Sequence, residues 1–433
     1  MPLHPLTLGP IIRHNTTTSI RLWGKSNKDF PYLVARIYET GYFHHTIVNS
    51  DTNFTGTVTL TYLHACSLRK YQMAMTDSNF SCTEGWLSEA DWENIPVYTF
   101  SLDSDNASLS FILGSCRFFL PIFCYTLFGN SGDKIFNSIN KQLETKPVDF
   151  VAMIGDQIYA DTTISVLDKF LRAKSFSDFD DRYQRAFSYP HIKRLLACNP
   201  TYMIGDDHEY RDNYDMNVAN WELSVYRNAM NTFNFYQYVN GPHSPNNGRY
   251  WFNTIRKGIP FFWMDVRNER NQQQIISITQ LEALKAWLLQ YKDEVKCLVT
   301  AVPMFLCKED PDNWQNYKGQ LREILDLITI NSVKGLIILT GDAHMAVSSQ
   351  YSILGGSLKI TELMSSGFCS ILHDSENNVA EKHIIGPYVV KSQHTSNVIT
   401  VDLFSRVEIS ARTVKFSVYD KKGVLVNETL YNV

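Results

Sequence analysis

The feature that most constrains this chain is a set of four short apolar runs, each ending at a glycine that is followed by side chains able to bind a metal or move a proton. The four segments are FILGSC (111–116), VAMIGDQIY (151–159), YMIGDDHE (202–209) and LIILTGDAH (336–344). A run of about four to six apolar residues that stops at glycine indicates a buried strand breaking into a loop. In α/β sheets, ligands bind beyond the carboxyl ends of such strands. We therefore expect the four loops to meet at one cleft and to form a metal centre.

The pattern of apolar residues changes near residue 107. Residues 1–107 contain strand-like segments at 18–23, 32–38, 55–62 and 96–102, which predict a small β-sandwich domain. From residue 108 to residue 433, strand-like segments (148–154, 201–204, 261–265, 297–302, 336–340) alternate with helical ones (133–143, 181–197, 215–236, 278–291, 314–331). This alternation predicts an α/β domain. The tail from residue 397 is strand-like again, and we expect it to close a second sheet of that domain.

Composition argues against several classes of protein. The 433 residues suffice for more than one domain, and the formal net charge of −4 argues against a nucleic-acid-binding protein. No run reaches the roughly 18 apolar residues of a membrane-spanning helix, since Arg117 and Pro121 interrupt the nearest one. The eight cysteines form no CxxC pair and no Sec-type signal peptide is visible, so we expect reduced thiols and a cytoplasmic protein. Secretion without a signal peptide is an alternative that the sequence leaves open.

Three of the loop residues favour iron. Asp156 can bridge two cations with its two oxygens, and Tyr159 follows it in the same loop. The phenol of Tyr159 and the thiol of Cys116 both have high pKa values in water, so only a strongly Lewis-acidic ion holds both deprotonated. Ferric iron suits this pair better than zinc, which seldom binds tyrosine. His344 supplies an imidazole for the same centre.

The remaining loop residues offer oxygen ligands and one further imidazole. Asp207, Asn213 and Asp342 favour a hard cation such as Ca²⁺, Mg²⁺ or Mn²⁺. His208 is left free to donate a proton or to contact the transition state. Taken singly, each residue has a structural explanation, such as a buried inert thiol for Cys116 or a turn-forming role for an aspartate. A metal site is the better interpretation because four strand ends carry complementary ligands.

In their order along the chain, these motifs resemble the PhoD family of alkaline phosphatases and phosphodiesterases, in the calcineurin-like metallophosphoesterase superfamily. The similar segments are GSC (114–116), GDQIYAD (155–161), DDHE (206–209), DVRNER (265–270) and GDAH (341–344). The opening segments LGPII (8–12) and TSIRLW (18–23) resemble the start of that family's N-terminal domain. The resemblance implies a metallophosphoesterase-type β-sandwich flanked by helices, an α/β (α+β) fold at 108–433, preceded by a small all-β fibronectin- or Ig-like domain at 1–107.

The resemblance also implies roles for the site residues. The Fe³⁺ ligands that it implies are Cys116, Asp156, Tyr159 and His344. The Ca²⁺ ligands that it implies are Asp156, Asp207, Asn213 and Asp342. His208 would be the catalytic histidine, and Arg267 would contact or support the phosphate region. The family often has a second asparagine where this chain has Asp212, so the second ion stays open among Ca²⁺, Mn²⁺, Mg²⁺ and Zn²⁺.

These interpretations predict a metal-dependent hydrolase of small-molecule phosphoric esters, either monoesters or diesters. A hydroxide held between the two cations would attack phosphorus in line with the leaving oxygen, and His208 would protonate the leaving alkoxide. A phospholipase D-like lipid phosphodiesterase is the enzymatic alternative. A non-catalytic binding protein on the same fold is the alternative from another class, and it would require lost ligands, whereas this chain keeps all of them.

Overall fold

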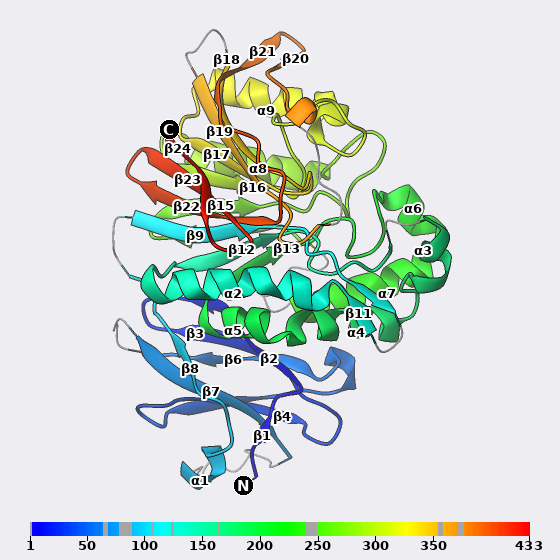
Figure 1. The fold of residues 1–433 in the computed structure, drawn as a ribbon. Helices are drawn as coiled ribbons and strands as arrows, with labels where there is room; N and C mark the ends of the chain where they lie inside the picture. The colour runs from blue at the N-terminus through cyan, green and yellow to red at the C-terminus, as the bar shows by residue number, and fades with distance from the viewer. Residues whose placement is uncertain are drawn as a thin grey trace.

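The computed structural model has two small sheets near the N-terminus and a larger sandwich of two sheets with helices on its outer sides (Figure 1). The structure describes residues 2–63, 68–77, 89–104, 108–122, 125–162, 165–238, 249–353, 358–370 and 376–433. Within these ranges, no helix combines the length and the apolar character that a membrane crossing requires.

The N-terminal sheets pack face to face. The first contains β1 (His4–Pro5), β4 (Tyr32–Ile37), β5 (Phe43–Ile47), β7 (Arg69–Thr76) and β8 (Tyr98–Phe100), and the second contains β2 (Leu8–Asn15), β3 (Ile20–Lys25) and β6 (Thr55–Leu60). Val58 and Leu60 of β6 are buried in the core between these sheets, whereas the intervening Thr59 is exposed. This alternation gives β6 one buried face, whereas β2 is buried along almost its whole length. The all-β N-terminal domain expected from the sequence is therefore confirmed, while its proposed boundary lies beside residues 105–107, outside the described chain.

Two larger sheets form the rest of the chain. The six-stranded sheet has the order β13 (Thr201–Ile204), β12 (Phe150–Ile154), β9 (Ser108–Gly114), β22 (Leu403–Ser410), β23 (Thr413–Asp420) and β24 (Leu425–Asn432). The eight-stranded sheet has the order β14 (Phe252–Arg256), β15 (Ile259–Trp263), β16 (Lys296–Val299), β17 (Leu336–Thr340), β19 (Leu358–Ser365), β18 (Ala346–Ile353), β21 (Tyr388–Thr395) and β20 (Lys382–Ile385). Strands β9, β12 and β13 are mutually parallel, as are β15, β16, β17 and β19.

The two larger sheets share one apolar core. Phe111 of β9 stacks on Phe150 of β12 with ring centroids 4.7 Å apart, and Trp263 of β15 packs against the same Phe150 ring. Ile112, which lies between Phe111 and Leu113, belongs instead to the core beneath the helices. Because successive side chains of a strand point to opposite faces, the apolar part of β9 is buried on both sides. The predicted sandwich flanked by helices is confirmed.

Helices cover both outer faces of this sandwich. On the six-stranded sheet lie α2 (Gly129–Thr145), α4 (Phe176–Ser188), α5 (Pro190–Cys198) and α7 (Leu223–Phe233), and on the eight-stranded sheet lie α8 (Ile278–Gln290) and α9 (Lys318–Ile330) (Figure 1). The N-terminal sandwich packs below α4 and α5, with β2 against α5. Short helices α3 (Ser165–Leu171) and α6 (Met216–Trp221) lie beside one end of the larger sandwich, on the right of Figure 1.

Two of the expected helices are corrected, and the expectation for the tail agrees with the structure. The helix expected at 181–197 is two helices, because Pro190 begins α5 and leaves Tyr189 in an extended conformation. The helix expected at 215–236 divides at Glu222 and ends in a π-helix, η2 (Asn234–Tyr238). The tail closes one of the two larger sheets, as expected: β22, β23 and β24 complete the sheet that contains β9, because β22 pairs antiparallel with β9.

Candidate metal centre

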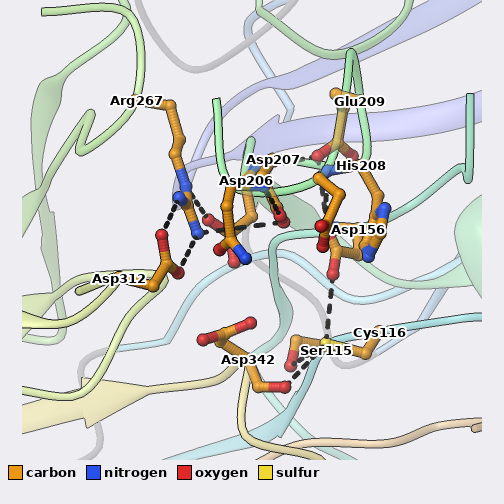
Figure 2. A network of polar contacts seen from close by, with 12 residues as sticks. Ser115, Cys116, Asp156, Asp206, Asp207, His208, Glu209, Arg267, Asp312 and Asp342 are labelled. Atoms are coloured by element: carbon orange, nitrogen blue, oxygen red, sulfur yellow. Dashed lines mark hydrogen bonds and ion pairs between the residues drawn. The ribbon is translucent and has the colours of Figure 1, made fainter. Parts of the chain in front are cut away.

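The site lies where four strands from the two sheets end. Cys116 follows β9, Asp156 follows β12, Asp207 follows β13, and Asp342 follows β17. Although β17 belongs to the other sheet, its loop reaches the same place, since the Cys116 Sγ atom lies 3.7 Å from the Asp342 carbonyl oxygen. Figure 2 shows side chains from all four loops facing one another. The convergence expected from the sequence is thus a feature of the structure.

The backbone of these loops is strained at the residues that carry the chemistry. Cys116, Asp156, Asp342 and His344 have φ angles of 56°, 54°, 68° and 48°. Residues with a Cβ atom rarely adopt this left-handed region, and such strain concentrates at functional sites, where the surrounding structure imposes it. Position 155 accepts only glycine, because Gly155 has a φ angle of 109° and a Cβ atom there would lie 2.6 Å from the Asp206 Cβ atom.

Four carboxylates form a compact group: Asp156, Asp206, Asp207 and Asp342 each offer an oxygen within 4.8 Å of the others. The buried Oδ2 atom of Asp206 and Oδ1 atom of Asp207 have no hydrogen-bond partner. Burial, and then neighbouring carboxylates, raise the pKa of Asp156 and of Asp342 well above the ordinary value. Crowded, buried and partly unpartnered carboxylates of this kind fit a multivalent cation, which would compensate their charge.

The residues expected to bind iron lie beside this group. The Cys116 Sγ atom is 3.4 Å from Asp156 Oδ2, and the Tyr159 hydroxyl is 3.4 Å from His344 Nε2. Burial, followed by nearby anionic groups, raises the pKa of both the Cys116 thiol and the Tyr159 phenol. Both groups would therefore lose their protons only to a bound cation. This donor set of one thiol, one phenol, one imidazole and one carboxylate fits the ferric centre expected from the sequence.

His208 is held on two sides. Its Nδ1 atom lies 2.6 Å from Asp161 Oδ1, and its ring stacks on Tyr159 with centroids 4.2 Å apart. Burial acts to lower the pKa of His208, but the negative charges of Asp207, Asp161 and Asp156 outweigh it and raise that pKa well above the ordinary value. These carboxylates thus favour the protonated form of the imidazole.

Arg267 and Asn213 lie at the edge of the carboxylate group. Arg267 is 1% exposed; it donates from Nε to Asp206 (2.5 Å) and from its terminal nitrogen to Asp312 Oδ2 (2.6 Å), so its guanidinium is occupied by carboxylates. The backbone N–H of the exposed Asn213 donates to Asp207 Oδ2 at 2.6 Å. The polar environment orients the Asn213 side-chain nitrogen towards Asp312 Oδ1, at 2.9 Å. Asp312 therefore holds both Arg267 and Asn213.

An open cleft of about 360 Å³ gives access to the centre. Among its lining residues are Asp207, His208, Asp212, Asn213, Asp342 and His344. Its volume falls within the range of small-molecule sites, roughly 300–1,000 Å³. Cys116, Asp156 and Tyr159 are buried and are not among the residues that line this cleft.

Four residues of the site were not among the sequence candidates. Asp161 is the last residue of the GDQIYAD motif, and Glu209 is the last residue of the DDHE motif. Their places in these motifs are the sequence signal for Asp161 as a partner of His208 and for Glu209 as a partner of the loop backbone. Asp206 adjoins Asp207 in the sequence, and Arg267 lies 2.5 Å from a carboxylate oxygen of Asp206 and 3.8 Å from one of Asp207. Asp312 lies in a loop without a recognisable motif, and only the folded chain brings it to Arg267.

This fold and acidic centre define a metal-dependent phosphoesterase. The sequence profile described as PhoD-like phosphatase matches residues 119–418, which is 300 of the 433 residues. The chain therefore belongs to the PhoD-like phosphatase family and is a phosphoric ester hydrolase. The matched segment contains every proposed site residue except Cys116, which lies three residues before it.

One solved structure supports the fold, and a second one matches more weakly. A structure of PhoD matches with a TM-score of 0.70 and 13% identity, covering 99% of this chain and 90% of that chain. GAP50, the anchor in the inner membrane complex of Plasmodium, matches with a TM-score of 0.45 and 12% identity, over 76% of this chain and 90% of that chain. No curated protein sequence matches the chain.

Proposed function

We propose that this protein hydrolyses small phosphate esters with a pair of unlike metal ions. The residues proposed to hold Fe³⁺ are Cys116, Asp156, Tyr159 and His344. The residues proposed to hold Ca²⁺, or another divalent ion, are Asp156, Asp207, Asn213 and Asp342. The observation that carries the proposal is the convergence of strained loops that place carboxylates with unpartnered oxygens next to a thiol, a phenol and two imidazoles.

When bound, the two ions would activate a water molecule as the nucleophile and neutralise charge on the phosphoryl group. The protein's own contribution begins with His208, which lines the cleft and whose pKa is raised by the neighbouring carboxylates. Asp161 holds Nδ1, so the opposite nitrogen, Nε2, donates its proton to the oxygen of the leaving alcohol. Arg267 supports this centre indirectly, because it balances the charges of Asp206 and Asp312 instead of facing the cleft.

The cleft favours a small ester over a lipid, because polar and acidic side chains dominate its lining. We therefore propose soluble phosphate monoesters or diesters as the substrates. The lipid phosphodiesterase alternative would need an apolar path for acyl chains beside the cleft, and the cleft-lining residues Asp212, Asp310 and Asp312 do not provide one.

Metal content and turnover of two model substrates test the proposal together. The purified protein should contain iron and should hydrolyse p-nitrophenyl phosphate, bis-p-nitrophenyl phosphate or both. Cys116→Ser should lose iron and activity while its far-ultraviolet spectrum stays close to that of the wild type, because Cys116 lies in a loop outside the strand pairing. Wild-type turnover with unchanged iron content in Cys116→Ser would refute the ferric assignment.

A further inference from the structure

Glu209 is a buried carboxylate that joins two of the ligand-bearing loops (Figure 2). Its Oε2 atom accepts the backbone N–H groups of Asp156 (3.1 Å) and Asp206 (2.8 Å). Its Oε1 atom accepts the backbone N–H of Gln157 at 2.7 Å. The left-handed conformation of Asp156 needs such support, because a strained backbone persists only where surrounding contacts impose it.

Gln237 contacts Glu209 from the outer side of these loops. Its Nε2 atom donates to Glu209 Oε1 at 2.9 Å and lies 3.0 Å from the Tyr183 hydroxyl. Gln237 is 2% exposed and belongs to η2, the π-helix that follows α7. Short π-helical turns occur frequently at functional sites. The position of this side chain therefore depends on how η2 is held.

Two side chains of the N-terminal sandwich hold η2. The indole nitrogen of Trp23, on β3, donates to the Phe235 carbonyl at 3.0 Å. The guanidinium of Arg13, on β2, donates to the Tyr236 carbonyl. Both carbonyls belong to residues immediately before Gln237. A continuous series of contacts thus runs from the N-terminal sandwich through η2 and Glu209 to the loop that carries Asp156.

We propose that Gln237 is a positioning residue for the metal centre, and that the N-terminal sandwich acts through Arg13 and Trp23 to keep it in place. The inference rests on the proposed function, because it takes Asp156 and Asp207 as metal ligands. Hydrogen-bonded partners behind metal ligands fix their orientation, and losing one typically weakens metal binding or activity about 10- to 100-fold. The N-terminal domain then contributes to catalysis without supplying any atom to the cleft.

Gln237→Met tests the first step, because methionine keeps the length and packing of glutamine but cannot donate to Glu209. Ca²⁺ affinity of the full-length protein should fall about 10-fold or more by titration calorimetry, and hydrogen exchange at the amides of Asp156 and Gln157 should quicken. The matched control is Tyr183→Phe, which removes the other partner of the same nitrogen and leaves the Glu209 contact. Its Ca²⁺ affinity should equal that of the wild type. Unchanged Ca²⁺ affinity in Gln237→Met, or an equal fall in both variants, would overturn the proposal.

Arg13→Met tests the second step on the N-terminal side. It should weaken Ca²⁺ binding in the same direction by a smaller factor, since it acts through η2. Tyr71→Phe is its control, because the Tyr71 hydroxyl also bonds across the domains, to the Ala197 carbonyl on α5 at 2.7 Å, outside this series of contacts. Wild-type protein that binds no metal and hydrolyses no ester would refute the proposed function. If the wild type is active and binds metal, and Arg13→Met and Tyr71→Phe have the same Ca²⁺ affinity, only the role of the N-terminal sandwich would be refuted.

Discussion

The Nδ1 atom of His208 lies 2.6 Å from the Oδ1 atom of Asp161, and the two residues come from loops after neighbouring strands β13 and β12. The same Asp161 accepts the backbone N–H of Asp212 through its other oxygen, at 2.6 Å. This double attachment fixes the direction of the imidazole ring, which also stacks on Tyr159. Asp161 therefore fixes the orientation of His208, whereas Asp207, Asp161 and Asp156 together raise its pKa.

Replacing His208 should affect turnover far more than metal binding. His208→Ala should lower kcat by about 10²- to 10⁴-fold, the range for a positioned proton donor, because it removes the imidazole that Asp161 holds in place. Metal content should stay near that of the wild type. Asp207→Ala is the comparison, and it should deplete the second ion. Equal metal depletion in both variants would show that His208 is itself a ligand.

Replacing Asp161 should shift the pH dependence of activity. The charge of Asp161 is one of those that raise the pKa of His208, so Asp161→Asn should lower that pKa. The protonated imidazole would then be lost at a lower pH, and the alkaline limb of the kcat profile should move towards acid. The measurement is kcat from about pH 5 to pH 10, and an alkaline limb at the same pH as in the wild type would argue against His208 as the proton donor.

Tyr159 should give the protein a colour. Charge transfer from a phenolate to Fe³⁺ absorbs visible light, so protein purified without chelators should show a visible band. Tyr159→Phe should shift or remove that band, because the hydroxyl that lies 3.4 Å from His344 Nε2 is lost. A colourless wild-type protein that contains no iron and is fully active with zinc or manganese would contradict the iron assignment.

Arg267 should matter for stability. Arg267→Met leaves the buried Asp206 and the half-buried Asp312 with less compensation, and breaking a buried ion pair such as Arg267–Asp206 costs about 3–5 kcal/mol. Urea unfolding measures this loss. Arg267→Lys keeps the positive charge but not the two-nitrogen contact with Asp312, so it should lose less stability than Arg267→Met. A large fall in kcat with an unchanged unfolding midpoint would instead indicate direct contact with substrate.

Glu362 should make the stability depend on pH. It is fully buried in β19 and accepts the backbone N–H groups of Met304, Phe305 and Leu306, yet burial raises its pKa to about 7 from 4.5. Because the pKa is higher in the folded state, its favourable contribution is complete below about pH 4.5 and is lost as the pH rises through about 7. This difference corresponds to about 3 kcal/mol.

Glu362→Gln, which carries no titrating proton, should therefore flatten the pH dependence of the unfolding free energy between about pH 4.5 and 7. The comparison is between slopes, because glutamine also loses one acceptor oxygen for the three N–H groups. Parallel stability curves for variant and wild type would show that Glu362 has an ordinary pKa.

Local patterns in the sequence were sufficient for the strands and loops that build the site. The apolar runs before Cys116, Asp156 and Asp207 are strands because they are uniformly hydrophobic, and each run stops at a glycine. The ends of the helices were harder to predict from the sequence than the strands. The break at Pro190 follows from a local rule about residues before proline, whereas the π-helical end at Asn234–Tyr238 depends on contacts with Trp23 and Arg13.

The sequence by itself determined which residue types stand at the ends of the central strands, and hence the family and the kind of chemistry, because strand periodicity and the glycine that ends each strand act over a few residues. Only the tertiary structure decided the partners: Asp161 for His208, Asp312 for Arg267, and Gln237 for Glu209. These pairs join residues separated by about 30 to nearly 50 positions. Buried polar groups need hydrogen-bond partners, and each finds its partner among the groups that the fold brings close in space. Local sequence patterns do not encode that proximity.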